Sequence, residues 1–323
     1  MFSILAFLAF AGATVASGIV DRRNVDLTST YTDWNAIRSA LVAKGDQHAT
    51  SSPLRPFAAA ALPEPDVPAG YELAFGPLNA SSSAPGYMGF VFIDSYDPEV
   101  CSDFCKVRDF DATGGLCQFF NLYQATVNKN STTFTCALYF LSTDNSTATN
   151  TGDATVTITE SRGYRRISAV ENGTFETLAC TPPAITCSAT NSGGWVGTTD
   201  TAVIVHDATL AHFGSGAVSL GSLSGNTTNS GKISTPVLHT TAGLPYALGF
   251  FHTNTLRNAV NASSGVVNVT WNGIVIDTLQ GASNWTFHGY TLDAKGNDTL
   301  AFVGGRFPAY DFIDDVFLFS LVN

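Results

Sequence analysis

The chain has few charged residues, and this shortage sets the first limits on its function. Only 13% of its 323 residues are charged, and 26 Asp and Glu against 15 Lys and Arg give a formal net charge of −11. Nucleic-acid binding depends on clustered Lys and Arg that neutralise phosphates, so this composition excludes a nucleic-acid partner. Gly, Ser, Thr and Asn are abundant instead. A surface of hydroxyl and amide groups is typical of secreted β proteins.

Apolar runs long enough to cross a bilayer are also missing. Residues 1–17 are apolar, short and followed by a small residue, which predicts a secretory signal peptide cleaved after Ser17. Six cysteines, an even number, suit an oxidising compartment. Nine acceptor sequons also predict export, at Asn79, Asn130, Asn145, Asn172, Asn226, Asn261, Asn268, Asn284 and Asn297. We expect a secreted glycoprotein, extracellular or in the cell wall, with no membrane span.

Motifs that mark enzymes are absent from the sequence. It has no Gly-x-Ser-x-Gly nucleophile elbow, no His-Glu-x-x-His zinc motif and no phosphate-binding loop. We therefore expect no catalytic residues. A pair of glycosidase carboxylates, which no short motif would mark, stays open as the alternative.

The segment over 18–69 precedes the first domain. Thr32 or Asp33 can cap a helix that Gly45 ends, with Trp34, Ile37 and Leu41 at helical spacing. Residues 46–69 contain five prolines, which predicts an extended linker. We expect this part to be loosely attached or removed as a prosegment.

Four cysteines cluster in the next region, over 70–168. Asp97 and Pro98 predict the start of a helix, on which Cys101 and Cys105 leave the same face. Cys117 and Cys136 lie in two strand-like runs that follow, so two disulfides would fasten the helix to a sheet. Three pairings are possible for four cysteines. A zinc site is the rival interpretation, disfavoured because no histidine lies in the cluster.

The spacing of these residues resembles the PAN/apple domain. The motif Cys-x3-Cys, Cys-x2-Phe and Cys-x-Leu-Tyr is matched by Cys101, Cys105, Cys117, Phe120, Cys136, Leu138 and Tyr139. The resemblance implies disulfides Cys101–Cys136 and Cys105–Cys117, and a further ligand or protein partner for this domain. Cys180 and Cys187, seven residues apart after this domain, predict a local bridge.

The region over 169–323 is predicted to be entirely β. Short strand-like runs recur with turn residues between them, which indicates a β-sandwich or jelly roll. Asn272-Gly273 is a strong signal for a two-residue hairpin. The expected fold class is thus mainly β, an α+β PAN/apple-like domain followed by a sandwich.

The order of motifs in this region resembles a galactose-binding-like jelly roll of the kind found in carbohydrate-binding modules. The matching pieces include Gly194-Trp195, the run over 213–222 and the final FIDDVFL over 312–318. The resemblance implies a structural calcium ion held by Glu176 and Asp314, with carbonyls near His212–Gly216, including Gly214.

The neighbouring carboxylates Asp314 and Asp315 lie within a strand-like run. Successive strand residues point to opposite faces, so both can share one side only at a bulge. A carboxylate that faces inward is costly unless it is paired or binds a metal, and Ca²⁺ prefers carboxylate and carbonyl oxygens. We therefore include Asp315 in the calcium prediction. The alternative is an inward Asp that accepts hydrogen bonds from loop amides.

The sequons indicate which aromatic side chains could stack on a sugar. A glycan on Asn268 or Asn284 requires that side chain to face solvent, which turns Trp271 and Trp285 inward by strand alternation. Trp195 and Tyr310, in loop-like stretches, are left as the predicted ligand-stacking residues.

The two domains together, with the run over 70–90 leading into the cysteine cluster, resemble the fruit-body specific protein a family of basidiomycete fungi. The resemblance implies an extracellular or cell-wall protein of fruiting tissue. We expect a non-catalytic glycoprotein that binds extracellular or cell-wall glycans through the sandwich. The alternatives are a glycoside hydrolase and a purely structural wall protein.

Overall fold

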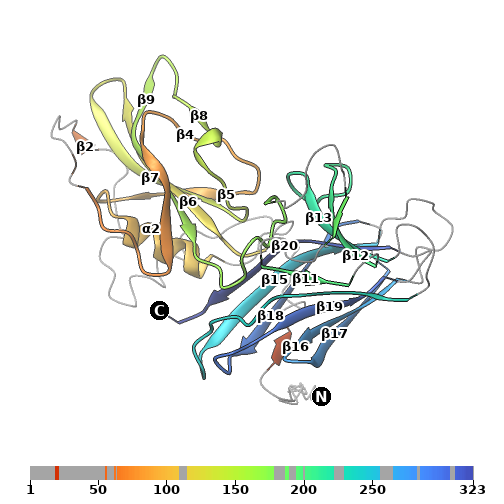
Figure 1. The fold of residues 1–323 in the computed structure, drawn as a ribbon. Coiled ribbons are helices and arrows are strands. Elements are labelled where there is room, and N and C mark those ends of the chain that lie inside the picture. Colours follow the sequence, from red (N-terminus) through yellow and green to blue (C-terminus); the bar gives the residue numbers. More distant parts are fainter. Residues whose placement is uncertain are drawn as a thin grey trace, which may run out of the picture.

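A computed structural model describes residues 19–21, 55–56, 62, 64–108, 115–177, 186–188, 194–198, 201–221, 229–254, 265–281, 284–305 and 310–322. The expected signal peptide and helix over 32–45, Cys180, Asn226 and Asn261 lie outside these residues. The Cys180–Cys187 bridge therefore stays a prediction. In the described part, no helix is long and apolar enough to cross a membrane. The fold is mainly β, as predicted, with one sheet that carries a helix and one sandwich (Figure 1).

The N-terminal module is a six-stranded antiparallel sheet with α2 (Pro98–Val107) against one side. Its strands are β2 (Arg55–Pro56), β3 (Tyr71–Leu78), β5 (Tyr87–Ile93), β6 (Phe119–Val127), β7 (Ser131–Tyr139) and β9 (Val156–Arg166). A short pair, β4 (Ser81–Ser82) and β8 (Ala148–Asn150), and the 3-10 turn Asn145–Thr147 lie beside it.

The helix begins where the sequence predicts. The Asp97 side chain accepts a hydrogen bond from the Glu99 amide, and Pro98 occupies the first turn. Disulfides join Cys101 to Cys136 and Cys105 to Cys117, the pairs that the PAN/apple resemblance implies. The PAN/apple assignment itself stays a prediction.

The sandwich packs a seven-stranded sheet against a five-stranded one. The first contains β1 (Ile19–Asp21), β18 (Thr286–Asp293), β15 (Pro245–Thr253), β20 (Asp311–Ser320), β13 (Gly216–Leu220), β12 (Ala202–His206) and β10 (Thr186–Ser188) in that order. The second contains β11 (Val196–Gly197), β14 (Gly231–Ser234), β19 (Leu300–Gly304), β16 (Val266–Trp271) and β17 (Ile274–Gln280).

The predicted hairpin joins β16 to β17. Trp271 pairs with Ile274, and Asn272 and Gly273 have φ values of 53° and 77°, which Asn and Gly adopt most readily. Alternation along β16 buries Val267, Val269 and Trp271, as expected for a strand with one face in the core.

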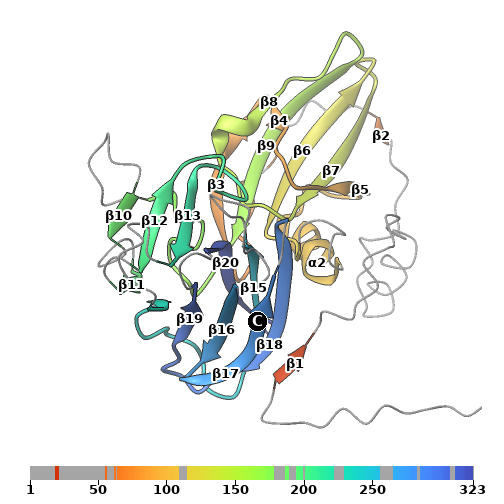
Figure 2. The ribbon, with the colours of Figure 1, turned by 90° about the vertical axis from the view of Figure 1, so that its right-hand side faces the viewer.

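Residues near the chain end connect the two modules. Leu116 packs in one apolar cluster with Ala247, Phe317 and Phe319 of the sandwich. The Arg166 guanidinium lies 4.7 Å from the centre of the Phe319 ring and donates a hydrogen bond to the Ser320 carbonyl. Figure 2 shows the N-terminal sheet beside the end of the sandwich where β20 runs.

Candidate functional site

Asp314 and Asp315 are both buried, at 0% and 5% exposure. A bulge makes this possible: Gly249 pairs with Phe317 and Phe251 with Asp314, so two residues of β20 oppose one of β15. Asp315 has a φ of 50°, in the left-handed region that non-glycine residues seldom adopt. The bulge that two neighbouring strand residues need to share one side is therefore present.

The buried carboxylates hold the loop that leads into β13. Asp314 Oδ2 accepts hydrogen bonds from the amides of His212 (2.9 Å) and Phe213 (3.3 Å). Asp315 Oδ2 lies 2.6 Å from His212 Nδ1. The His212 ring stacks on Phe251 at 3.7 Å between centroids, which fixes its orientation.

Burial sets the ionisation of this pair. It raises the pKa of Asp314, and repulsion from Asp315 raises it further. It also raises the pKa of Asp315, against the opposing effect of His212, while Glu176 adds repulsion. Asp315 therefore lies close enough to both Asp314 and Glu176 for their charges to repel.

Glu176, near the start of this domain in the sequence, contacts the same loop. Its Oε1 accepts hydrogen bonds from the amides of Ser215 (2.7 Å) and Gly216 (2.8 Å), and Oε2 accepts one from Ser215 Oγ (3.0 Å). Gly214 has a φ of 72°, and a Cβ atom there would overlap Glu176 Oε1. The structure thus brings Glu176, Gly214, Asp314 and Asp315 to one loop.

The donor set has the chemistry that Ca²⁺ prefers, namely hard oxygens from carboxylates beside a loop that can offer carbonyls. Among the described residues, no three His, Cys, Asp or Glu side chains converge as a metal-binding group. Backbone oxygens would therefore have to complete the shell. The hydrogen bonds observed here are those of the alternative interpretation, in which an inward Asp accepts from loop amides.

Trp195 and Tyr310 do not form an exposed platform, so the prediction that they stack on a ligand is wrong. Trp195 is 1% exposed, packs against Phe175 and Phe302, and donates its Nε1 hydrogen to the Glu171 carbonyl. Tyr310 is 8% exposed and packs beside Phe312. Both stretches look like loops in sequence, but their rings complete apolar clusters.

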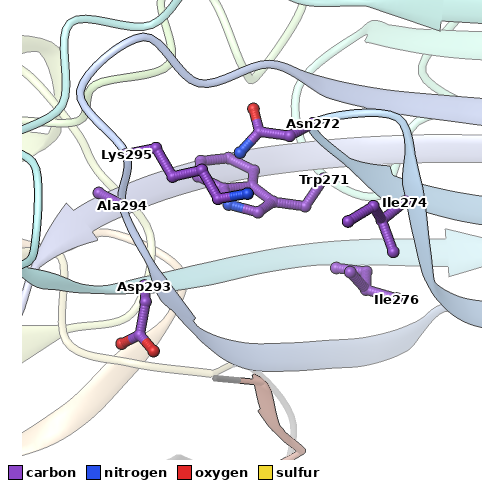
Figure 3. Close-up of a pocket in the computed structure, with 7 residues that line it drawn as sticks. All are labelled: Trp271, Asn272, Ile274, Ile276, Asp293, Ala294 and Lys295. Atoms are coloured by element: carbon purple, nitrogen blue, oxygen red, sulfur yellow. The ribbon is translucent and has the colours of Figure 1, made fainter. Parts of the chain in front are cut away.

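A cavity of about 310 Å³ opens at the edge of the sandwich (Figure 3). Its wall comes from the end of β16, from β17, and from the end of β18 with the turn that follows. The lining residues are Trp271, Asn272, Ile274, Ile276, Asp293, Ala294 and Lys295.

Trp271, predicted from strand alternation to face the core, also lines this cavity. It is 5% exposed, yet its Nε1 is buried without a hydrogen-bond partner within the described residues. Buried indole N–H groups usually find an acceptor, so an unpaired one beside a cavity is unusual. Trp285 is half-buried against His212, 5.6 Å between ring centroids.

Asp298 fixes two walls of the cavity. It is fully buried and accepts hydrogen bonds from Asn272 Nδ2 (2.6 Å) and the amides of Lys295 (2.8 Å) and Gly296 (3.2 Å), and from Thr240 Oγ1. Although burial alone would raise it, these hydrogen bonds lower the pKa of Asp298. A charged Asp298 therefore keeps the hairpin and the 293–296 turn in place.

Seven of the nine acceptor asparagines lie in the described part. Five are exposed, namely Asn79, Asn130, Asn145, Asn284 and Asn297, and Asn172 and Asn268 are partly exposed. Glycosylation stays a prediction at all nine.

No protein-family model matches the chain, and no curated protein matches it. Solved structures that resemble it include carbohydrate-binding modules. TmCBM61 in complex with β-1,4-galactotriose is 20% identical, with a TM-score of 0.32 over 48% of this chain and 99% of that one. The C-terminal family 22 carbohydrate-binding module of Clostridium thermocellum Xyn10B is 14% identical, with a TM-score of 0.34 over 48% and 95%. A CBM4 structure is 17% identical, with a TM-score of 0.30 over 46% and 97%. Likenesses this distant transfer neither ligand nor site residues to this chain.

Proposed function

We propose that the chain is a secreted, non-catalytic glycoprotein whose sandwich binds carbohydrate of the cell wall or extracellular matrix. From the resemblance of its sequence to the fruit-body specific protein a family, we propose that it acts in fungal fruiting tissue. The observation that carries the proposal is the cavity at the sandwich edge, where a buried indole N–H has no partner within the described residues.

The lining of this cavity matches the chemistry of a sugar. A sugar ring presents hydroxyls that accept and donate, and C–H faces that pack on apolar groups. Trp271 Nε1 would donate to a hydroxyl, the Asp293 carboxylate would accept from hydroxyls and Lys295 would donate. Ile274 and Ile276 offer the apolar wall.

Calcium is proposed as a structural ion of the same domain. Glu176, Asp314 and Asp315, with the Gly214 carbonyl, would hold it, and its charge would offset the repulsion among the carboxylates. The hydrogen bonds that join these residues to the 212–216 loop support a shared location.

The glycosidase alternative needs two carboxylates on either side of the scissile bond. The sandwich cavity is lined by one, Asp293, and a second cavity, on the N-terminal sheet, also by one, Asp153. Neither cavity therefore favours hydrolysis.

The test is retention of the full secreted chain on insoluble fungal wall polysaccharides, compared with an Asp293→Asn/Lys295→Met variant. We expect wild-type retention and at least a tenfold weaker affinity for the variant, because a charged acceptor and a charged donor are lost. Lys232→Met, at an exposed position of β14 outside the cavity, is the matched control and should bind as wild type. Absence of retention on every polysaccharide would favour the structural wall protein, and equal binding by the double variant would refute the cavity as the site.

A further inference from the structure

The N-terminal sheet has a second side that α2 does not cover. Phe120, Leu122 and Cys136 point toward α2, in the cluster that includes Phe104. Alternate residues of the same strands face the other way. Figure 2 shows α2 and the β4–β8 pair on opposite sides of this sheet.

Part of this second side is covered by the chain itself. Phe75, Phe119, Ala137 and Tyr139 form a buried cluster there, with Ala84 and Ala148 packed against it. Another part of this side holds a trough of about 390 Å³. Its lining residues are Phe90, Phe92, Tyr123, Ala125, Val127, Thr133, Thr135, Asn150, Gly152, Asp153, Val156 and Ile158.

Most polar groups of the trough already have partners. Asn150 accepts from the Gly152 amide and donates to Ser81 Oγ. Asp153 Oδ1 accepts from the amides of Thr155 and Val156 and from Thr155 Oγ1. A polyhydroxylated ligand needs many free donors and acceptors, so the trough does not suit a sugar.

The trough nevertheless carries two features that point to a ligand. Phe90 is 45% exposed, beside Phe92 with ring centroids 5.2 Å apart. Thr133 is 6% exposed, and its buried Oγ1 has no hydrogen-bond partner within the part of the chain that the structure describes. A buried hydroxyl without a partner is costly, and a ligand that supplies one removes the cost.

We propose that this trough binds an uncharged, mainly apolar small molecule that carries one hydroxyl or carbonyl group for Thr133. Its volume lies within the range of small-molecule sites, about 300–1,000 Å³. Its lining contains no Lys or Arg and only one carboxylate, so nothing there would pair with a charged ligand. This site lies on the other module and takes another class of ligand than the glycan cavity, so either proposal can fail alone.

The test is a fluorescence titration of the full secreted chain with N-phenyl-1-naphthylamine, an uncharged apolar probe. We expect saturable, one-to-one binding that an uncharged aromatic or isoprenoid alcohol displaces. Phe90→Ser should weaken probe binding about tenfold, because it removes a ring that the ligand covers. Leu73→Ser, at a residue of similar exposure (40%) on β3 outside the trough, is the control and should bind as wild type.

Thr133→Val tests the hydroxyl without changing the side-chain shape. We expect alcohol competitors to bind at least fivefold more weakly, with the probe almost unaffected and the midpoint of unfolding not lowered. Absence of saturable binding, or equal losses in Phe90→Ser and Leu73→Ser, would overturn the proposal. Displacement of the probe by soluble oligosaccharides rather than by alcohols would make the trough a sugar site instead.

Discussion

In the N-terminal module, disulfides fasten α2 to the sheet, whereas in the sandwich Glu176 and Asp314 fasten the 212–216 loop through hydrogen bonds to backbone amides. The first kind of link is covalent and insensitive to pH or ions. The second depends on the charge of two carboxylates, of which Asp314 is buried and Glu176 is exposed. Conditions that leave one module intact should therefore unfold the other.

Removal of a disulfide should have the largest effect. Replacement of both Cys101 and Cys136 by Ala should lower the stability of the N-terminal module by about 2–5 kcal/mol, because the unfolded chain gains freedom. The Cys105/Cys117 double variant should lose about 1 kcal/mol less, since that bridge spans 12 residues rather than 35. Denaturant unfolding measures both, and a loss of stability in the sandwich instead would contradict the comparison.

Removal of the proposed calcium ion should act on the sandwich. With free calcium at about 100 times its Kd, the ion would stabilise the sandwich by about 2.7 kcal/mol. A chelator should therefore lower the melting temperature of the sandwich and leave the N-terminal module unchanged. In Asp314→Asn the chelator should have little effect. An unchanged wild-type melting curve would mean that hydrogen bonds alone hold the loop and that no calcium ion is bound.

Asp298→Asn should cost the sandwich about 1.5–3 kcal/mol at neutral pH, because four donors lose a charged acceptor. The pKa of Asp298 is lowered on folding, so its contribution is complete above the unfolded pKa and is lost as pH falls through the folded pKa. Wild type should therefore lose more stability than the variant between about pH 5 and pH 2. Parallel stability curves would contradict a charged Asp298.

The smallest expected effect is the difference in stability between two glycine substitutions. Gly214→Ala and Gly243→Ala both place a Cβ at positive φ, 72° and 81°, which costs about 1–2 kcal/mol. Only Gly214→Ala also pushes against Glu176, whereas the space around Gly243 is open. Gly214→Ala should thus be about 1 kcal/mol more destabilising by denaturant unfolding. Equal costs would mean that Glu176 moves freely away from the loop.

Local patterns in the sequence predicted the elements well. The strand-like runs predicted after residue 200 form strands β12 to β20, because apolar residues in them alternate with turn residues between them. The Asp97 cap and the Asn272-Gly273 hairpin were predicted from single residues whose backbone preferences are strong.

The site was less predictable because it depends on packing between distant segments. That Glu176 and Asp314 contact the same loop was expected only from the resemblance to carbohydrate-binding modules. Trp195 was misassigned because a Gly-Trp pair that reads as a loop inserts its ring between the sheets. No sequence signal distinguishes Trp271 from other core residues, since its free N–H follows from the cavity that β17 and β18 leave beside it.

The most direct test of the glycan site follows the indole N–H signals of ¹⁵N-labelled protein during titration with an oligosaccharide from a retained wall polysaccharide. The chain has only 4 tryptophans, and Trp271→Phe identifies the relevant signal. We expect the Trp271 signal to shift in a saturable manner while that of Trp195, already bonded to Glu171, stays in place. Saturable binding that leaves the Trp271 signal unmoved would contradict the account.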